Sequence, residues 1–159
     1  MGFTTADLCD AHPGLVRVVE PLFRDYGGLP SFSGPVETIQ TYEDNTAVRD
    51  ALERPGKGRV LVVDGGGSLR CALVGGRLGQ LAQQNGWNGI LVNGCVRDSA
   101  ELSQIEVGIR ALNTAPQRSS KSGRGAVGVN LTFAGAEFVP GMILYADQDG
   151  ILLADRPLI

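Results

Sequence analysis

The chain has 159 residues, of which 43% are hydrophobic and 19% are charged, and its formal net charge is −3. This length and composition suit one domain with a sizeable core and exclude a disordered chain. The acidic balance also lacks the basic footprint of a protein that binds nucleic acid directly.

The cysteines and the hydropathy of the chain bear on its location. Cys9, Cys71 and Cys95 have no metal-type spacing and lie among apolar residues, so we expect them to be reduced thiols. There is no basic-then-apolar leader and no apolar run of about 20 residues. The sequence therefore predicts a cytoplasmic protein without a membrane segment.

The first third of the chain predicts a short helix, a loop and a strand. Thr4 or Thr5 could cap a helix over residues 7–11. Residues 22–28 form a loop with aromatic anchors, and residues 32–42 alternate in the way that a β-strand does.

A second helix is predicted to run through Leu52, with Asn45 as its candidate N-cap. Glu43 and Asp44 precede this cap. Their charge would favour a helix start, and the alternative is that one of them faces an active site.

The central stretch has the clearest pattern. Residues 60–63 and 69–74 are apolar runs typical of buried strands. Gly75 and Gly76 stop the second run, and the spacing of the apolar residues then predicts a helix over 77–86. The free N–H groups at the start of that helix favour an anion.

The next buried strand, residues 90–92, leads to Arg97 and Asp98. Open α/β sheets usually bind ligands at the carboxyl ends of their strands. Arg97 and Asp98 therefore join the glycine pair as candidate site residues. Asp98 or Ser99 is also a candidate cap for a short helix over 99–102.

After a strand candidate at 107–112, residues 116–128 form a basic loop rich in Ser and Gly. It carries Arg118, Lys121 and Arg124. The loop is either simply solvated or a flap or partner contact, because loops often carry function.

The last 31 residues predict two hairpins, 129–139 and 142–154. Strands alternating with helices in the centre and hairpins at the end indicate a mixed α/β fold, with helices covering a layered sheet.

The glycine clusters do not indicate a nucleotide cofactor. Neither 65–67 nor 75–79 matches the dinucleotide-binding pattern in register, and the lysine of a P-loop is absent. A methyltransferase activity likewise has no support in these residues.

Arg97 and Asp98 suit a 2-oxo acid. An arginine binds a carboxylate with two parallel hydrogen bonds. Aspartate is a hard oxygen ligand for Mg²⁺ or Mn²⁺, either of which can stabilise an enolate. Amides of residues 75–78 would add donors to a charged substrate.

Several motifs together resemble the RraA-like family: TADLCDA, FRDYGG, YEDN, DGGGSLRCALVGGRLGQLAQQNGW, GCVRDSAEL and VPGMILYADQDGILL. Their combined order is specific, and the resemblance covers essentially the whole chain. The family holds regulators of ribonuclease E activity and metal-dependent 4-hydroxy-4-methyl-2-oxoglutarate aldolases. The resemblance implies one domain over residues 1–159, a swivelling β/β/α layered sandwich, and a homotrimer.

The resemblance to the aldolase branch also implies roles for individual residues. Gly75, Gly76, Arg77 and Leu78 match the substrate-binding segment of that branch. Arg97 matches its substrate-binding arginine, and Asp98 matches its metal-binding aspartate. This chain departs from the branch at Gly76, where the aldolases carry an acidic residue.

Two functions follow as hypotheses. The first is a divalent-metal-dependent aldolase that cleaves 4-hydroxy-4-methyl-2-oxoglutarate-type 2-oxo acids to pyruvate, with oxaloacetate decarboxylation as a side activity. The second is a regulator that binds and inhibits ribonuclease E through protein–protein contact, without touching RNA. Retention of Arg97 and Asp98 favours the first hypothesis, and Gly76 favours the second.

Overall fold

The computed structural model describes residues 2–159. Its main sheet has ten strands, most of them in the spatial order β1-β12-β11-β3-β4-β6-β7-β2, with β5 beside β6 and β8 beside β3. β9 and β10 form a separate two-stranded sheet. The strands are β1 (Val16–Val18), β2 (Arg24–Asp25), β3 (Phe32–Gln40), β4 (Val60–Asp64), β5 (Ala72–Val74), β6 (Gly89–Val96), β7 (Gly108–Thr114), β8 (Ala126–Val127), β9 (Leu131–Phe133), β10 (Ala136–Phe138), β11 (Ile143–Asp147) and β12 (Gly150–Ala154). The helices are α1 (Thr5–Ala11), α2 (Thr46–Leu52), α3 (Gly76–Gln84) and α4 (Ser99–Leu102).

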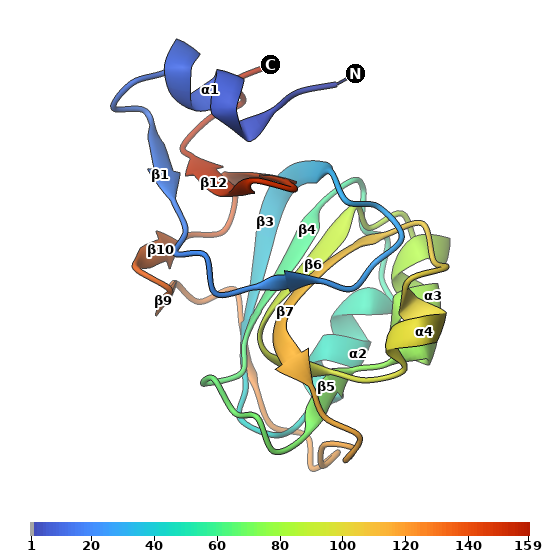
Figure 1. The fold of residues 1–159 in the computed structure, drawn as a ribbon. Helices are drawn as coiled ribbons and strands as arrows, with labels where there is room; N and C mark the ends of the chain where they lie inside the picture. The colour runs from blue at the N-terminus through green and yellow to red at the C-terminus, as the bar shows by residue number, and fades with distance from the viewer. Residues whose placement is uncertain (1) are drawn as a thin grey trace.

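The centre of the sheet is parallel and separates two cores. β3, β4, β6 and β7 run in the same direction. Along β4, Leu61 and Val63 face a core shared with the helices, whereas Val60 and Val62 face a core shared with the β9–β10 hairpin. Helices α2, α3 and α4 therefore cover one face, and the hairpin lies on the other (Figure 1). This layering confirms the predicted α/β sandwich.

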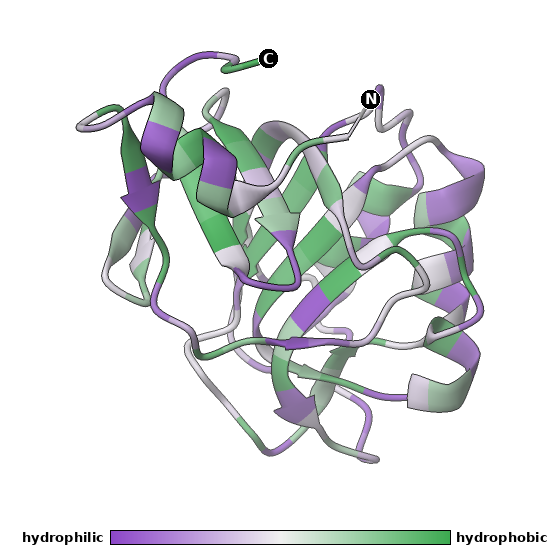
Figure 2. Cartoon of the chain, turned by 45° about the horizontal axis from the view of Figure 1, so that its top comes forward, coloured by the Kyte–Doolittle hydropathy of each residue, from purple (hydrophilic) through white to green (hydrophobic). Residues whose placement is uncertain are grey.

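Hydropathy along the chain follows these layers. The central strands are mostly hydrophobic, while the helices carry hydrophilic residues on the outside (Figure 2). A strand buried on both faces reads as a continuous apolar run because it has no solvent side, and every residue of β4 is buried. No helix within residues 2–159 has the length and apolarity needed to span a membrane.

Among the strands whose bounds differ from the sequence-based expectation, β5 and β6 lie next to the candidate site. The run at 69–74 starts too early, since β5 begins at Ala72 and Leu69 is 60% exposed. β6 continues past Val92 through Val96, because Asn93 stays paired in register with β4 and its side chain donates to Asp64 Oδ1 at 3.0 Å.

In α1 and α2, side chains that precede the helix accept hydrogen bonds from its first N–H groups. Thr4 caps α1 as predicted, with its side-chain oxygen accepting from the Asp7 N–H at 3.1 Å. Asn45 occupies the N-cap position of α2 as predicted, but its side chain makes no capping hydrogen bond. Asp44 Oδ1 accepts from the Thr46 N–H at 2.9 Å, and Asn45 instead donates to the Leu73 carbonyl. An Asn45 side chain turned toward β5 cannot also cap its own helix.

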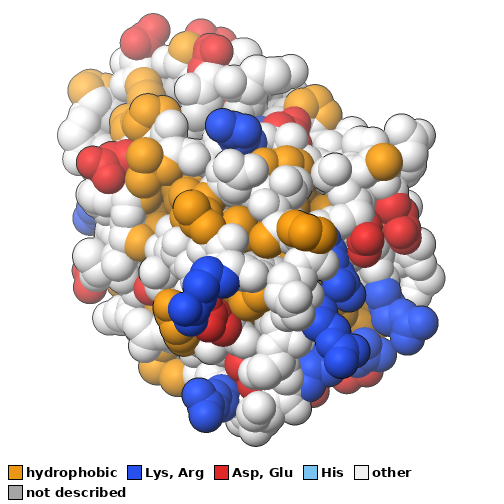
Figure 3. All heavy atoms as spheres, turned by 60° about the horizontal axis from the view of Figure 1, so that its bottom comes forward, with side chains coloured by type: hydrophobic (Ala, Val, Ile, Leu, Met, Phe, Trp, Pro, Cys, Tyr) orange, Lys and Arg blue, Asp and Glu red, His pale blue; other side chains and the backbone are white. Residues whose placement is uncertain are grey.

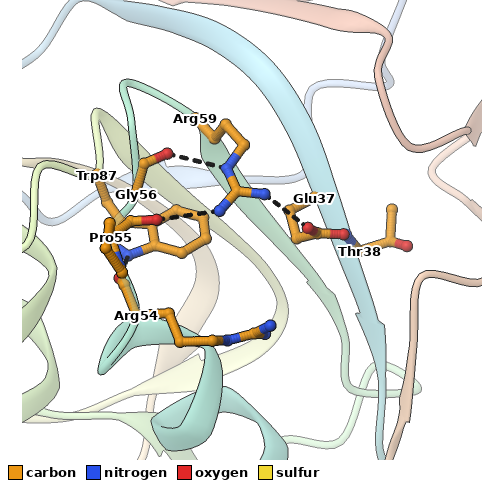
Figure 4. A network of polar contacts seen from close by, with 7 residues as sticks. All are labelled: Glu37, Thr38, Arg54, Pro55, Gly56, Arg59 and Trp87. Carbon is orange, nitrogen blue, oxygen red and sulfur yellow. Dashed lines mark hydrogen bonds and ion pairs between the residues drawn. The ribbon is translucent and has the colours of Figure 1, made fainter.

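The segment from α2 to β4 is held by Arg59 (Figure 4). Its guanidinium donates to the Gly56 and Pro55 carbonyls, pairs with Glu37 at 2.8 Å, and lies 5.0 Å from the centre of the Trp87 ring. This joins the turn after α2 to β3 and to Trp87 in the connection between α3 and β6. The two connections that enter β4 and β6 are therefore tied together at the amino ends of these strands.

Candidate active site

The carboxyl ends of the parallel strands meet at one edge of the sheet. There the structure has a cavity of about 190 Å³. Pockets for drug-sized ligands are larger, at roughly 300–1,000 Å³, so a small molecule fits this cavity best. It is lined by Asn45, Arg49, Ala72, Gly75, Gly76, Arg77, Leu78, Arg97, Asp98, Arg118, Ser119 and Lys121.

All six residues singled out from the sequence line this one cavity: Gly75, Gly76, Arg77, Leu78, Arg97 and Asp98. They come from the start of α3 and from the end of β6. The Leu78 side chain is only 5% exposed and packs in the helix-side core. Leu78 can therefore serve a ligand only through its backbone.

Asp98 joins the two segments. Its Oδ2 accepts a hydrogen bond from the Gly76 N–H at 2.9 Å, at the N-terminus of α3. It also occupies the N-cap position of α4, but its side chain makes no cap hydrogen bond there. Of the two candidate caps, Asp98 and Ser99, Asp98 therefore holds the N-cap position without a side-chain capping bond, because its carboxylate is turned toward the other helix. Oδ1 is left for a ligand.

The backbone of Asp98 is left-handed, with φ of 59°. Asp and Asn adopt this conformation more readily than most residues. Strained backbone of this kind is often found at functional sites. Here it turns the carboxylate back over the start of α3.

Arg97 lies beside this carboxylate. Its N–H donates to the Val74 carbonyl at 2.9 Å, and its guanidinium donates to the Pro116 carbonyl at 3.3 Å. A Cβ on Gly75 would lie 2.9 Å from Asp98 Oδ2 and 3.3 Å from Arg97 Cγ. Only glycine at 75 therefore allows both side chains to approach α3. Within residues 2–159 no carboxylate pairs with Arg97, so its guanidinium is available to an anionic ligand.

The cavity is strongly cationic although the chain is acidic. Its lining holds Arg49, Arg77, Arg97, Arg118 and Lys121, and the only acid in the lining is Asp98. Lys and Arg side chains gather on the face that carries the strand ends (Figure 3). Sequence reasoning missed Arg49. It lies one helical turn after Asn45, but nothing local indicates which way α2 faces.

Position 76 carries no acidic side chain, but the carboxylate of another residue, Glu101, lies against it. A Cβ built on Gly76 would collide with the carboxylate of Glu101 in α4. That carboxylate therefore fills the volume into which a side chain at 76 would grow, next to Asp98. It also accepts from the Gln80 amide at 2.6 Å. Sequence reasoning did not single out Glu101, although its spacing of three from Asp98 is compatible with one side of a helical turn.

Neither Glu43 nor Asp44 lines the cavity. Glu43 pairs with Arg70 at 2.6 Å and accepts from Ser68. The hydrogen bond from Arg70, together with that from Ser68, lowers the Glu43 pKa to about 2. The hypothesis that Glu43 or Asp44 faces the site is therefore wrong, because neither side chain lines the cavity.

Asp44 instead anchors the basic loop. It is fully buried, and its Oδ2 accepts from the Ser120 hydroxyl and the Ser122 N–H. Burial alone would raise its pKa, but these hydrogen bonds and those from Thr46 outweigh it and hold the pKa at about 2. Of the three cations in the loop, Arg118 and Lys121 reach the cavity and Arg124 does not. The loop is therefore part of the site wall.

Replacing Asp44 tests this anchor. Asp44→Asn removes the charge and leaves an amide donor facing donors on the loop. Because hydrogen bonds to charged groups contribute about 1.5–3 kcal/mol each, we expect the free energy of unfolding at pH 7 to fall by about 2–3 kcal/mol. Denaturant unfolding measures this loss.

The pH dependence of the loss has a defined sign. A carboxylate with a depressed pKa stabilises the fold above its unfolded pKa of 3.8, and this stabilisation disappears as the pH falls toward about 2. The difference between wild type and Asp44→Asn should therefore be constant above about pH 5 and shrink between pH 4 and 2. A difference that does not change with pH would show that the Asp44 charge is not what holds the loop.

The residues fit a divalent cation only in part. Within residues 2–159 there is no group of three or more His, Cys, Asp or Glu side chains placed to hold a metal. Mg²⁺ often takes one or two carboxylates, with waters and substrate oxygens completing its shell. Asp98 supplies one carboxylate, and the Glu101 carboxylate lies against Gly76, whose N–H Asp98 binds. The surrounding cations disfavour a free metal ion, so binding of the metal together with an anionic ligand suits this cavity.

Comparisons with known proteins agree with this architecture. The family model "RraA-like: Aldolase/RraA" matches residues 5–153. A protein of Burkholderia mallei (strain SAVP1), named "Putative 4-hydroxy-4-methyl-2-oxoglutarate aldolase", is 55% identical over 164 residues, which cover 100% of this chain and 99% of that protein.

Two solved structures are also similar. The RNA-processing inhibitor RraA from Thermus thermophilis superposes with a TM-score of 0.96 at 45% identity, covering 100% of this chain and 96% of that one. A Geobacillus kaustophilus HTA426 structure titled as an S-adenosylmethionine: 2-dimethylmenaquinone methyltransferase has a TM-score of 0.94 at 47% identity, covering 98% and 97%. The family match spans nearly the whole chain, and these relatives match it end to end. The chain therefore belongs to the RraA-like family.

Proposed function

We propose that this protein is a divalent-metal-dependent lyase that acts on 2-oxo acids, breaking a C–C bond to release pyruvate. The observation that carries the proposal is the junction of Arg97, Asp98 and the first turn of α3 in one cavity. The curated relative's name supports 4-hydroxy-4-methyl-2-oxoglutarate as the type of substrate.

Each residue of the site has a separate role that follows from its chemistry. Arg97 is free to take the substrate carboxylate with two parallel hydrogen bonds. The first N–H groups of a helix have no partner within it. Gly76, Arg77 and Leu78 form the first turn of α3 and line the cavity, where the helix dipole favours an anion. Asp98 would hold a divalent cation, which would supply Lewis-acid stabilisation of the negative charge that develops on the substrate.

Two reactions pass through the enolate of pyruvate but differ in their need for a base. In retro-aldol cleavage the 4-hydroxyl gives its proton to a base, and the C3–C4 bond breaks. The C4 fragment leaves as one pyruvate, and the electron pair of the broken bond forms the enolate of a second pyruvate, which then takes up a proton. In oxaloacetate decarboxylation the bond to the distal carboxylate breaks, CO₂ leaves, and no hydroxyl proton is removed. A chain without an acid at 76 should therefore keep decarboxylation better than aldol cleavage.

The test is release of pyruvate from oxaloacetate and from 4-hydroxy-4-methyl-2-oxoglutarate. Each substrate is assayed with Mg²⁺, with Mn²⁺ and with EDTA. We expect metal-dependent release of pyruvate that EDTA abolishes. After subtraction of its spontaneous decay, oxaloacetate should be cleaved faster than 4-hydroxy-4-methyl-2-oxoglutarate. Rates equal to the enzyme-free control under every condition would overturn the proposal.

A second candidate function is inhibition of ribonuclease E by protein contact. The similarity to a solved RNA-processing inhibitor and the glycine at position 76 favour it. The net charge of −3 opposes direct RNA binding. Inhibition of ribonuclease E by the purified protein should then increase with the fraction of ribonuclease E that is bound in a complex. The protein alone should not shift RNA on a gel. Salt-sensitive RNA binding by the protein alone would contradict this mode of inhibition.

We also propose a cytoplasmic homotrimer. The three cysteines are unpaired, as is usual in a reducing compartment. Leu15, Val18 and Leu22 are each about half exposed or more, at 47%, 61% and 52%, which suits a contact between subunits. Light scattering should give roughly three times the 16.7 kDa chain mass, and a monomer at micromolar concentration would refute the trimer.

A further inference from the structure

A second cavity, of about 430 Å³, lies at the carboxyl ends of β3 and β4. Its lining includes Gln40, Tyr42, Asp64, Gly66, Gly125 and Ala126. Within residues 2–159 it has no lining residue in common with the cavity at the start of α3. Asp64 is the only charged residue that the described part of the chain places in this lining, so the second cavity has a negative charge.

A row of paired residues across the sheet forms the floor of this cavity. Gln40 of β3 is paired with Asp64 of β4 on one side and with Ala126 of β8 on the other. Asn93 of β6 is paired with Asp64 and extends the row. Paired residues point to the same face of a sheet, and that face alternates along a strand. Val62 of β4 packs in the core of the β9–β10 hairpin, so the floor lies on the face away from the helices.

The Asp64 carboxylate has one oxygen without a partner. Its Oδ1 accepts from the Gly66 N–H at 2.9 Å and from the Asn93 amide at 3.0 Å. Within residues 2–159 no group donates to Oδ2. Asp64 is only 8% exposed, and its side chain lines the cavity. Because a buried carboxylate is costly unless it is paired, a cationic donor in the cavity would stabilise it.

Tyr42 supplies an aromatic wall beside this carboxylate. A Cβ built on Gly66 would lie 2.9 Å from Tyr42 Cδ1, so the ring packs closely against that glycine. The N–H of the same glycine binds Asp64. The ring and the carboxylate therefore flank one residue, which has no side chain to separate them and whose φ of 68° favours glycine. Aromatic faces attract cations, and a guanidinium also stacks on them.

We propose that the second cavity binds a guanidinium group. The group donates to Asp64 Oδ2 and stacks on Tyr42, and the Gln40 amide oxygen is a further acceptor in the row. A guanidinium suits this cavity better than an ammonium does, because it has several donors in one plane and is more weakly hydrated. The inference does not depend on the lyase proposal. The guanidinium belongs either to an arginine side chain of a partner protein or to a free small molecule.

The probes are N-acetylarginine amide, N-acetylcitrulline amide and methylguanidine. Citrulline has the shape of arginine without its charge. Titration of the full chain, followed by the NMR shifts of its backbone amides, should give a dissociation constant of roughly 1–10 mM for the capped arginine. The shifts should centre on Gly66 and Gly125, and the affinity should fall as salt rises. The capped citrulline should leave these amides unchanged.

Methylguanidine distinguishes the two sources of the group. An affinity equal to that of the capped arginine would show that the cavity recognises the guanidinium alone, as it would in a free small molecule. A markedly tighter capped arginine would show that peptide groups contribute, as they would in a partner protein. Both results support the site.

Asp64→Asn tests the charge, with Asp50→Asn as the matched control. Asparagine at 64 can still accept from Gly66 and Asn93, so the fold should be kept, while the capped arginine should bind ~10-fold more weakly or worse. Asp50 is exposed on α2 and lies outside the lining, so its variant should stay within ~2-fold of wild type. Tyr42→Leu keeps an apolar wall without the aromatic face and should weaken binding ~2–5-fold.

Several results would overturn the site. They are unchanged binding in Asp64→Asn, equal shifts with the capped citrulline, and no binding of either guanidinium probe up to tens of millimolar. Shifts centred on Gly75 and Gly76 would place the ligand in the first cavity and also reject the proposal. If thermal unfolding shows that Asp64→Asn is not folded, Tyr42→Leu decides, and wild-type affinity in that variant would reject the site. None of these results depends on whether the protein cleaves 2-oxo acids.

Discussion

Asp98→Asn should lower kcat/KM for metal-dependent pyruvate release by about 10²-fold or more, while the fold stays intact. The substitution removes the charge that would hold a divalent cation beside the substrate. An asparagine oxygen can still accept from the Gly76 N–H at the start of α3. Asparagine also tolerates the left-handed backbone with φ of 59°. The free energy of unfolding should therefore fall by less than about 1 kcal/mol.

The measurement pairs steady-state kinetics with denaturant unfolding. Asp98→Ala is the matched comparison, since it removes the acceptor and is less tolerant of the left-handed backbone. It should be both inactive and less stable than Asp98→Asn. If Asp98→Asn unfolds the protein, and the folded remainder keeps full specific activity, then Asp98 is structural and the lyase proposal fails.

Gly76→Asp should raise aldol cleavage more than decarboxylation. It supplies a carboxylate beside Asp98, and a positioned acid or base contributes about 10²–10⁴-fold when proton transfer limits the reaction. The new side chain would grow into the volume of the Glu101 carboxylate. Glu101 is exposed and can swing away, but the two carboxylates would repel. The largest gain is therefore expected in Gly76→Asp combined with Glu101→Ala.

Three controls separate the charge from other effects. Gly76→Asn has a similar shape without the charge and should not increase cleavage. Glu101→Ala alone should lower cleavage in wild type if Glu101 stands in for the absent acid. Oxaloacetate decarboxylation should change least, because it removes no hydroxyl proton. A gain of equal size in both reactions would show that the missing carboxylate is not what limits aldol cleavage.

Much of the fold was predictable because its signals are local. The apolar run of β4 and the one-sided apolar residues of α3 specify a buried strand and a half-buried helix within a few residues each. The position of Arg97 and Asp98 follows from the same signal, since they come directly after β6. The layered arrangement and the family came from the resemblance of the motifs rather than from periodicity.

The errors in the prediction arise where partners are distant in sequence. Asn45 is the N-cap residue of α2, but only the position of β5 and of the loop after β7 decides that the Asp44 carboxylate, and not the Asn45 side chain, accepts from the first N–H of the helix. Asp98 or Ser99 was the candidate cap of residues 99–102; Asp98 holds that position, but the partner of its carboxylate is Gly76 on another helix. Local propensity could not predict which partner each side chain takes, because the free-energy difference between the partners comes from tertiary contacts.

The sequence by itself determined the strands and helices of the central sheet and the family, and it identified Gly75, Gly76, Arg97 and Asp98 as candidate site residues. Their signals are hydrophobic periodicity, turn chemistry and motif order, all of which are written along the chain. Only the tertiary structure decided that Glu101 lies against Gly76 and that Arg49, Arg118 and Lys121 share one cavity. These side chains lie up to about 70 residues apart in the sequence and meet because parallel strands carry their carboxyl ends to the same edge of a sheet.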